Sequence, residues 1–246
     1  MVKVDKVFVA HVKKGSEHRA IAMEKQLAKL GIEFEYMLDG DIEDITAERL
    51  EKYFVPDVEN SIVGRSKSHI SCALKHILIF EEVVKQNLNR ILVLEDDAIL
   101  TSDFVEKFNK SIDELESLHK PEEPTLAFYE ATHLQFIPRS VRQQGRILYE
   151  PRNLQCTACY TINNSYATTF LNHLEKNKCD IAIDDYMDRL RSSGVIPTMY
   201  QSHPDLCIQG SHTGACESLI FNRGFIRDFG RRFSYFYKKH ILYNLR

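Results

Sequence analysis

One stretch of the chain combines a strongly apolar run with a cluster of acids. Residues 91–94 are four consecutive large apolar side chains, and three carboxylates, Glu95, Asp96 and Asp97, follow directly. An unbroken apolar run predicts a strand buried on both faces, as in a parallel sheet. In extended chain Glu95 and Asp97 point to one side and Asp96 to the other. Carboxylates at the carboxyl end of a buried strand lie where open α/β sheets bind ligands, so this interpretation is favoured over an acidic turn.

Strand and helix patterns alternate along most of the remaining chain. The expected strands are 6–12, 32–38, 90–94, 125–129 and 156–162, with short extended pieces at 196–200 and 206–209. The expected helices are 17–30, 68–86, 104–118, 165–175 and 184–191. The first helix has a loose apolar face that includes Ile21 and ends at Gly31, a C-cap candidate. This order predicts a single α/β domain over residues 1–222 with a mostly parallel central sheet.

Composition excludes several classes of protein. The chain has 246 residues, 43% of them hydrophobic, so it can bury a substantial core, yet no window approaches 18 apolar residues. The N-terminal residues have charges spaced through them and predict a strand instead of a signal peptide, so a cytoplasmic location is expected. Six cysteines do not make a disulfide framework in a chain of this length. Cys156 and Cys159 have the spacing of a redox or zinc pair, but they lie in a strand pattern and are expected to be buried thiols.

The C-terminal residues 223–246 differ in charge from the rest. They hold seven Lys or Arg and one acid, a local charge of +6, so the other residues sum to −9. Aromatic residues are interleaved with these basic ones. Such a segment is typical of contact with an anionic membrane face or a nucleic acid, and the alternative is a helical tail packed on the body. We expect a basic and aromatic helical tail with a peripheral membrane contact and no nucleic acid partner.

Phosphate-binding loops are missing from the sequence. No G-x-G-x-x-G follows the first strand, and no G-x-x-x-x-G-K-[ST] occurs. If a phosphate is bound, a metal ion must therefore neutralise most of its charge. The carboxylates at 95–97 are the expected ligands, because paired hard oxygen donors suit Mg²⁺ or Mn²⁺.

Several segments in order resemble glycosyltransferase family 25, which contains bacterial lipooligosaccharide galactosyltransferases and, more distantly, collagen galactosyltransferases. The similar segments are 71–83 (SCALKHILIFEEV), 92–97 (LVLEDD), Arg19, Asp39-Gly40, 157–162 (TACYTI), Ile183-Asp184 and Pro204-x-Leu206-Cys207-x-Gln209. The resemblance covers roughly residues 5–220. In one departure, Lys75-His76 stands where the family usually has Ser-His, although Ser68-His69 offers that dipeptide seven residues earlier. The role of the family's serine is thus open in this chain.

The resemblance implies a GT-A-type, Rossmann-like domain that transfers a sugar from a nucleotide diphosphate with inversion. It implies Mn²⁺ or Mg²⁺ on Asp97, with Glu95 or Asp96 assisting and with His212 as a further ligand candidate. Asp184 is the candidate base that deprotonates the acceptor, and Asp185 is the alternative; a helix N-cap is the other interpretation of this pair.

The remaining candidates are contacts with the donor or the acceptor. They are His11, Arg19, Lys75, His76, Glu95, Asp96, Glu130 and Thr157. For several of them a structural role is an equally simple explanation, since a histidine on an apolar helix face is often a core residue and an exposed arginine often only solubilises.

The resemblance implies transfer of a hexose, most simply galactose from UDP-galactose, to a lipooligosaccharide or related glycan. Two other classes stay open. A metal-dependent nucleotide-sugar hydrolase or nucleotidyltransferase would use the same carboxylates, and a non-catalytic relative would bind a sugar nucleotide or glycan without turnover.

Overall fold

The computed structural model describes residues 1–58, 67–131, 135–151, 156–213, 237–242 and 245. Within these residues the chain forms an α/β domain built on a seven-stranded sheet with the order β2-β1-β3-β7-β5-β8-β6. The strands are β1 (Lys6–Ala10), β2 (Glu35–Met37), β3 (Arg90–Glu95), β5 (Leu126–Phe128), β6 (Leu148–Tyr149), β7 (Cys159–Asn163) and β8 (Met199–Ser202). Five strands share one direction, while β7 and β6 run antiparallel to their neighbours. The predicted mostly parallel α/β sheet is therefore confirmed.

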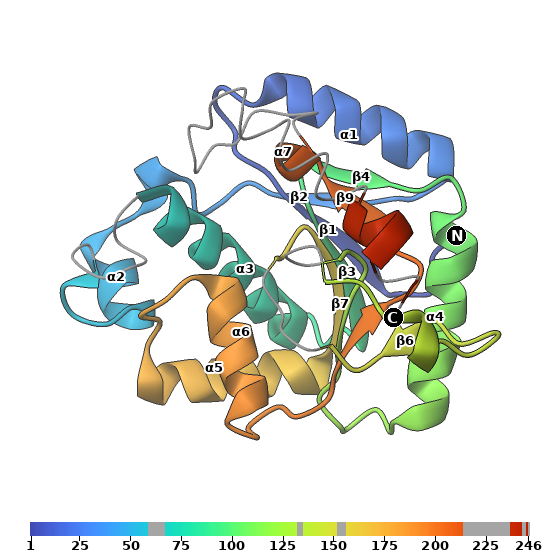
Figure 1. Ribbon diagram of the computed structural model, residues 1–246. Coiled ribbons are helices and arrows are strands. Elements are labelled where there is room, and N and C mark those ends of the chain that lie inside the picture. The colour runs from blue at the N-terminus through green and yellow to red at the C-terminus, as the bar shows by residue number, and fades with distance from the viewer. Residues whose placement is uncertain (59–66, 132–134, 152–155, 214–236, 243–244, 246) are drawn as a thin grey trace.

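Helices cover both faces of the sheet (Figure 1). They are α1 (Glu17–Leu30), α2 (Ala47–Tyr53), α3 (Lys67–Lys85), α4 (Phe104–Leu118), α5 (Asn164–Asn177) and α6 (Ile183–Ser192). Helices α1 and α4 lie on one face, and α3, α5 and α6 lie on the other. The chain passes from β1 to β2 through α1 and returns to β3 through α3, so β1 lies between two strands reached by crossovers on opposite faces.

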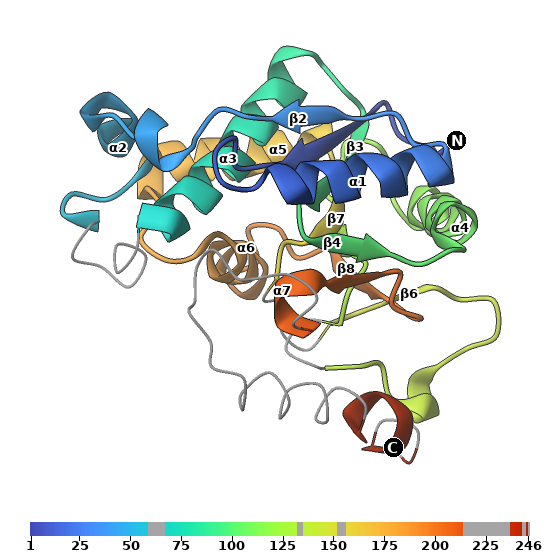
Figure 2. The same ribbon diagram turned by 90° about the horizontal axis from the view of Figure 1, so that it is seen from above.

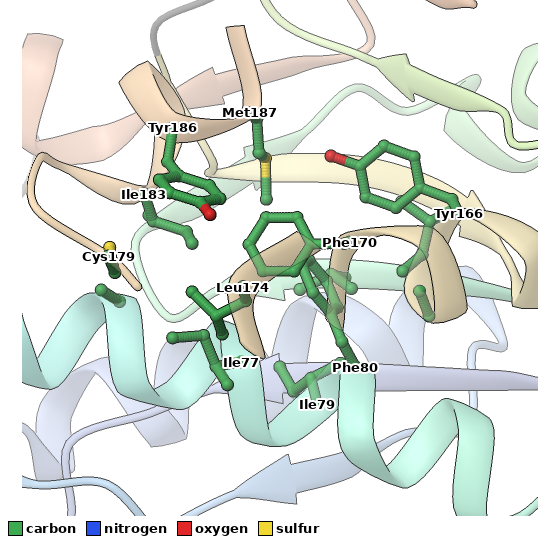
Figure 3. Close-up of a cluster of buried hydrophobic side chains, with 14 of the residues drawn as sticks. Ile77, Ile79, Phe80, Tyr166, Phe170, Leu174, Cys179, Ile183, Tyr186 and Met187 are labelled. Carbon is green, nitrogen blue, oxygen red and sulfur yellow. The ribbon is translucent and has the colours of Figure 1, made fainter. Parts of the chain in front are cut away.

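Alternation along the strands divides the core into two layers. Phe8 and Val93 face α3, α5 and α6, whereas Val9 and Leu94 face α1 and α4. Figure 3 shows the first layer, where side chains of α3, α5 and α6 meet. Phe80 lies at its centre, with edge-on ring contacts to Tyr160, Tyr166 and Phe170. This packing fixes α3 against the sheet and thereby positions the polar side chains near its N-terminal end.

One prediction from the helical patterns was wrong. Ile21 was placed on the apolar face of α1 but is 66% exposed, whereas Met23 and Leu27, also expected on that face, are buried together with Arg19, which meets a buried acid. The N-cap of α6 is Ala182, so the alternative interpretation of Asp184 and Asp185 as N-cap residues does not hold. Gly31 caps α1 in a left-handed conformation (φ 65°), as expected.

A second, two-stranded sheet returns the late part of the chain to the end of β3. Strand β4 (Ala98–Leu100) pairs antiparallel with β9 (Cys207–Gln209), and the short helix α7 (Gly210–Thr213) follows (Figure 2). The pairing aligns Ala98 with Gln209, one residue beyond Asp97. His212, the further candidate for a metal ligand, lies in this helical turn, and its side chain lies outside the described residues.

Most of the predicted tail, 223–246, also lies outside the described residues, apart from the helical turn Lys238–Leu242 and a few neighbours. The division at residue 222 therefore stays a prediction. In the part of the chain that the structure describes, no helix has the length and hydropathy required to cross a bilayer. Cys156 and Cys159 are buried free thiols, as predicted.

Candidate active site

A pocket of about 490 Å³ opens at the carboxyl ends of β1 and β3. The register pairs Ala10 with Glu95, so the two strands end at the same level. Because the crossovers from β1 and to β3 run on opposite faces, this is the switch point where open α/β sheets bind ligands. Side chains that line it come from several elements: Arg19, Cys72, Lys75, His76, Glu95, Asp96, Asp97 and Gln209. Six of the predicted site residues are thus brought to one cavity.

Asp96 has different partners from its two acidic neighbours. Asp96 and Asp97 lie in the turn between β3 and β4, so the strand alternation expected from the sequence does not extend to them. Its carboxylate binds Arg19 Nη1 at 2.7 Å and His11 Nδ1 at 2.8 Å. All three side chains are buried. Burial raises the pKa of Asp96, but His11 and Arg19 outweigh it and hold the pKa below its usual range. His11, Arg19 and Asp96 therefore form a structural link between β1, α1 and β3 as well as one wall of the pocket.

Glu95 is held by a different set of polar side chains from those that bind Asp96. Thr157 Oγ1 donates to Oε1, Gln209 Nε2 donates to Oε2 at 3.2 Å, and His76 Nε2 lies 3.4 Å from Oε1. Burial raises the pKa of Glu95, yet His76 and Thr157 keep it below the usual value. The carboxylate is thus fixed in its charged form at the floor of the pocket.

Asp97 carries a charge that the described side chains do not neutralise. Its Oδ2 accepts from the Ser211 N–H at 3.1 Å, while Oδ1 is buried and has no hydrogen-bond partner among the described residues. Burial and the charge of Glu95 raise the pKa of Asp97 to about 6. A buried, unpaired carboxylate oxygen beside a second carboxylate is a position that a hard divalent cation fits. The donor set therefore agrees with the Mn²⁺ or Mg²⁺ that the sequence predicted.

Lys75 has a structural partner that the sequence did not reveal. Its Nζ forms a buried ion pair with Asp41 at 2.7 Å and donates to the carbonyls of Leu38 and Asp39. Gly40, at φ 92°, lies so close that a Cβ there would stand 3.1 Å from the Lys75 side chain. Lys75 therefore fastens the loop after β2 to α3.

Asp184 and Asp185 lie in the first turn of α6, both half-buried. Burial and the neighbouring Asp185 raise the pKa of Asp184 to about 6. The charge of Asp184 also raises the pKa of the Cys72 thiol, which lines the pocket. Asp184 thus belongs electrostatically to the same site as Glu95. Asp185 donates its backbone N–H to Asp184 at 3.0 Å.

Glu130 lies deeper, 4% exposed, and accepts the Ala158 N–H at 3.0 Å. Burial and the charge of Glu95 raise the pKa of Glu130 to about 8, so its carboxyl is protonated at neutral pH. The sequence did not reveal the contacts that link Glu130 to Glu95. Cys156 lies against Glu130 and donates from Sγ to Gln209 Oε1 at 2.9 Å, and Gln209 Nε2 in turn donates to Glu95. The sequence contained one sign of this contact, because Gln209 is part of the late proline segment that resembles the family.

A second pocket, of about 570 Å³, lies around residues 135–150 and Gln201. It contains Arg142 and Arg146 but none of the predicted catalytic or metal-binding residues. Because the predicted metal-binding carboxylates line the smaller pocket, that pocket is the candidate active site.

An α/β domain with acidic side chains at the switch point of its sheet is typical of proteins that bind a nucleotide phosphate through a metal ion. The chain matches the family described as "Glycosyltransferase family 25 (LPS biosynthesis protein)" over residues 4–187. Since this match covers most of its length, the chain belongs to glycosyltransferase family 25, and the resemblance inferred from the sequence is confirmed.

Two curated relatives are distant. A "Glycosyltransferase 25 family member" of Drosophila melanogaster is 31% identical over 101 residues, 39% of this chain and 16% of the relative. A "Putative glycosyltransferase" of Haemophilus influenzae is 24% identical over 196 residues, 74% of this chain and 66% of the relative. The chain thus spans less than two thirds of each relative's length.

Solved structures show only remote likeness. A putative glucose-1-phosphate thymidylyltransferase from Bacillus anthracis gives a TM-score of 0.43 at 9% identity, covering 93% of this chain and 75% of the other. A glycosyltransferase involved in the glycosylation of the major capsid of PBCV-1 gives 0.37 at 8% identity, covering 81% and 92%.

The unpaired charge of Asp97 has a measurable consequence. Because the folded state raises the pKa of Asp97 from 3.8 to about 6, ionisation above that pH costs stability in the metal-free protein. Asp97→Asn keeps an oxygen for the Ser211 N–H and removes the charge, so we expect it to raise the metal-free Tm at neutral pH. The rise should be a few degrees, since 1 kcal/mol moves Tm by about 2–4 °C in a domain of this size.

The same variant should lose the Tm increase that Mn²⁺ gives the wild type. Calorimetric melts with Mn²⁺ and with EDTA measure both effects, and Glu51→Gln, an exposed carboxylate on α2, is the control that should retain the Mn²⁺ shift. If Mn²⁺ raised the Tm of Asp97→Asn as much as that of the wild type, Asp97 would not be a metal ligand.

Proposed function

We propose that this protein is a metal-dependent, inverting glycosyltransferase that moves a hexose, galactose from UDP-galactose, to a lipooligosaccharide or related glycan. The observation that carries the proposal is the unpaired Oδ1 of Asp97 beside Glu95, at the floor of a pocket at the switch point of the sheet. Family membership supports sugar transfer, and the family description names LPS biosynthesis.

In the proposed complex the nucleotide diphosphate lies over the carboxyl ends of β1 and β3. Asp97 and Glu95 would hold Mn²⁺ or Mg²⁺, which supplies Lewis-acid stabilisation of the charge that develops on the leaving diphosphate. The two buried basic side chains of the pocket, Arg19 and Lys75, are already paired with Asp96 and Asp41. This pairing supports a cation as the main source of positive charge for the donor phosphates.

Asp184 is the proposed base. Its pKa of about 6 leaves the carboxylate charged at neutral pH yet close enough to that pH to accept a proton, whereas Glu130, with a pKa of about 8, is protonated. In a single displacement, Asp184 takes the proton of the acceptor hydroxyl. The hydroxyl oxygen then bonds to the anomeric carbon as the bond from that carbon to the diphosphate oxygen breaks. Asp185 stays the alternative base.

Glu130 is assigned a different role in this proposal. As a neutral acid beside Cys156 and the Ala158 N–H, it can donate a hydrogen bond to a sugar hydroxyl. His76 and Thr157 act through Glu95, which both of them contact. His11 acts in the same way through Asp96.

The donor is tested by isothermal calorimetry against UDP-, GDP- and CMP-sugars, first with Mn²⁺ and then with EDTA. We expect a UDP-hexose, UDP-galactose foremost, to bind only with Mn²⁺, because the pocket offers carboxylates and no phosphate loop. Product analysis with and without a glycan acceptor separates the alternatives. Free galactose formed equally well without acceptor would indicate a hydrolase, pyrophosphate release a nucleotidyltransferase, and binding without any turnover a non-catalytic relative.

Removal of the base should act on turnover more than on binding. Asp184→Asn is expected to lower kcat by about 10²- to 10⁴-fold while calorimetric donor affinity is retained. In the wild type at saturating Mn²⁺, kcat should fall about tenfold per pH unit below pH 6, because protonated Asp184 cannot accept the hydroxyl proton. Asp188→Asn, on the same helix and paired with Arg191, is the control. Equal losses in the two variants would count against Asp184 as the base.

The basic and aromatic segment 223–246 is proposed to hold the enzyme at an anionic membrane surface, where lipid-linked acceptors lie. Deleting these residues should abolish sedimentation with phosphatidylglycerol vesicles, because the segment contributes a charge of +6. Undiminished vesicle binding by the truncated protein would refute this role.

A further inference from the structure

A thiol, an imidazole and a carboxylate converge beside the proposed donor site. Cys72 and His76 lie four residues apart on α3, so their side chains project from the same helix face. Glu95 meets them from the end of β3. One potential ligand atom from each of the three lies within 4.8 Å of the others, and no other such group of three occurs in the described part of the chain.

The imidazole of His76 meets this cluster through Nε2. His76 is fully buried, and its Nε2 makes no hydrogen bond of good geometry with the described residues, its contact with Glu95 Oε1 being 3.4 Å long. So long a contact satisfies a buried nitrogen poorly. A metal ion bound between His76 and Glu95 would satisfy both groups.

The spacing suits a small tetrahedral ion. Zinc bonds of about 2.0–2.3 Å place two ligands of one tetrahedral site roughly 3.3–3.7 Å apart. The distance from His76 Nε2 to Glu95 Oε1, 3.4 Å, already falls in that range. Cys72 Sγ, within 4.8 Å of the other two ligand atoms, would have to approach them by up to about 1.5 Å, and the pocket leaves the fourth position open for a water molecule.

Outer contacts orient two of the three ligands. His76 Nδ1 lies 2.7 Å from the hydroxyl of buried Tyr160, and when Nδ1 donates to that oxygen, the Nε2 lone pair faces Glu95 and Cys72. Thr157 and Gln209 donate to the Glu95 carboxylate. Metal-binding histidines and carboxylates usually have such partners, which fix the tautomer and the direction of the lone pairs.

The ligands at Cys72 and His76 favour a different metal ion from the one proposed at Asp97. Thiolate and imidazole favour zinc, whereas a carboxylate set with open positions suits Mg²⁺ or Mn²⁺. Burial and the charges of Glu95, Asp184 and Asp97 raise the pKa of the Cys72 thiol, and a bound cation would offset those charges.

We propose that Cys72, His76 and Glu95 form a zinc-binding site that is distinct from the Asp97 position and shares Glu95 with it. Binding replaces the proton of the Cys72 thiol with Zn²⁺ and releases that proton to solvent. Because one carboxylate serves both positions, zinc bound here inhibits metal-dependent use of the donor. This last consequence rests on the proposed function, whereas the zinc site itself does not.

Cobalt is the spectroscopic probe for the site. Co²⁺ added to the full-length, metal-free protein should give a near-ultraviolet thiolate-to-cobalt band and the visible bands of tetrahedral Co²⁺, and Zn²⁺ should displace it. Cys72→Ser should lose the thiolate band and weaken zinc affinity, measured with a competing zinc indicator, by about 100-fold or more, since even outer contacts are worth 10- to 100-fold. Cys72→Ala removes the ligand atom entirely and should give the same loss.

Two matched variants make the result specific. Cys179→Ser removes another buried thiol, one that bonds the Ile181 carbonyl away from the pocket, and should leave the cobalt spectrum unchanged. Asp97→Asn should keep the cobalt band while losing Mn²⁺-dependent binding of UDP-sugar. Absence of the thiolate band in the wild type, or its persistence in Cys72→Ser, overturns the proposal. Failure of UDP-sugar binding alongside an intact cobalt band would refute the proposed function and leave the zinc site standing.

Discussion

The ion pair between Arg19 and Asp96 determines how the acidic end of β3 is arranged. Three adjacent carboxylates at the end of a buried strand repel one another unless some of their charge is neutralised. Arg19 and His11 bind Asp96 at 2.7 and 2.8 Å, which leaves Glu95 and Asp97 without a lysine or arginine partner among the described residues. The charge of Asp96 is thereby neutralised by the protein. The charges of Glu95 and Asp97 remain available to bind a cation.

The remaining acids are distinguished by their surroundings more than by their type. Glu95 has hydrogen-bond donors and a low pKa, Asp97 and Asp184 have few donors and pKa values of about 6, and Glu130 is buried with a pKa of about 8. Groups whose environments separate their pKa values are suited to different tasks in one site. This separation supports the division into metal ligands, base and neutral hydrogen-bond donor.

Patterns along the sequence were sufficient for the main elements. The apolar run before Glu95 predicted β3, but alternation did not determine the direction of the acids, because Asp96 and Asp97 lie in the turn after the strand. The partners of these side chains could not be predicted, because periodicity shows which side of an element is buried and not which element lies opposite. The pairing of Asp96 with Arg19, 77 residues earlier, depends on that packing, as does the exposure of Ile21. Short α2 was missed for a related reason, since seven residues give too few turns for a clear apolar stripe.

The buried pair of Lys75 with Asp41 bears on how this chain can diverge from its relatives. Both side chains are about 4% exposed, so a serine at position 75, as is usual in the family, would leave the buried Asp41 carboxylate with Lys13, whose Nζ is 4.0 Å away, as its remaining ion-pair partner among the described residues. Breaking a buried pair on one side costs about 3–5 kcal/mol, a large part of a domain's stability. An exchange of this lysine for serine is therefore expected to need a compensating change at Asp41, so the identity of residue 75 constrains the loop after β2.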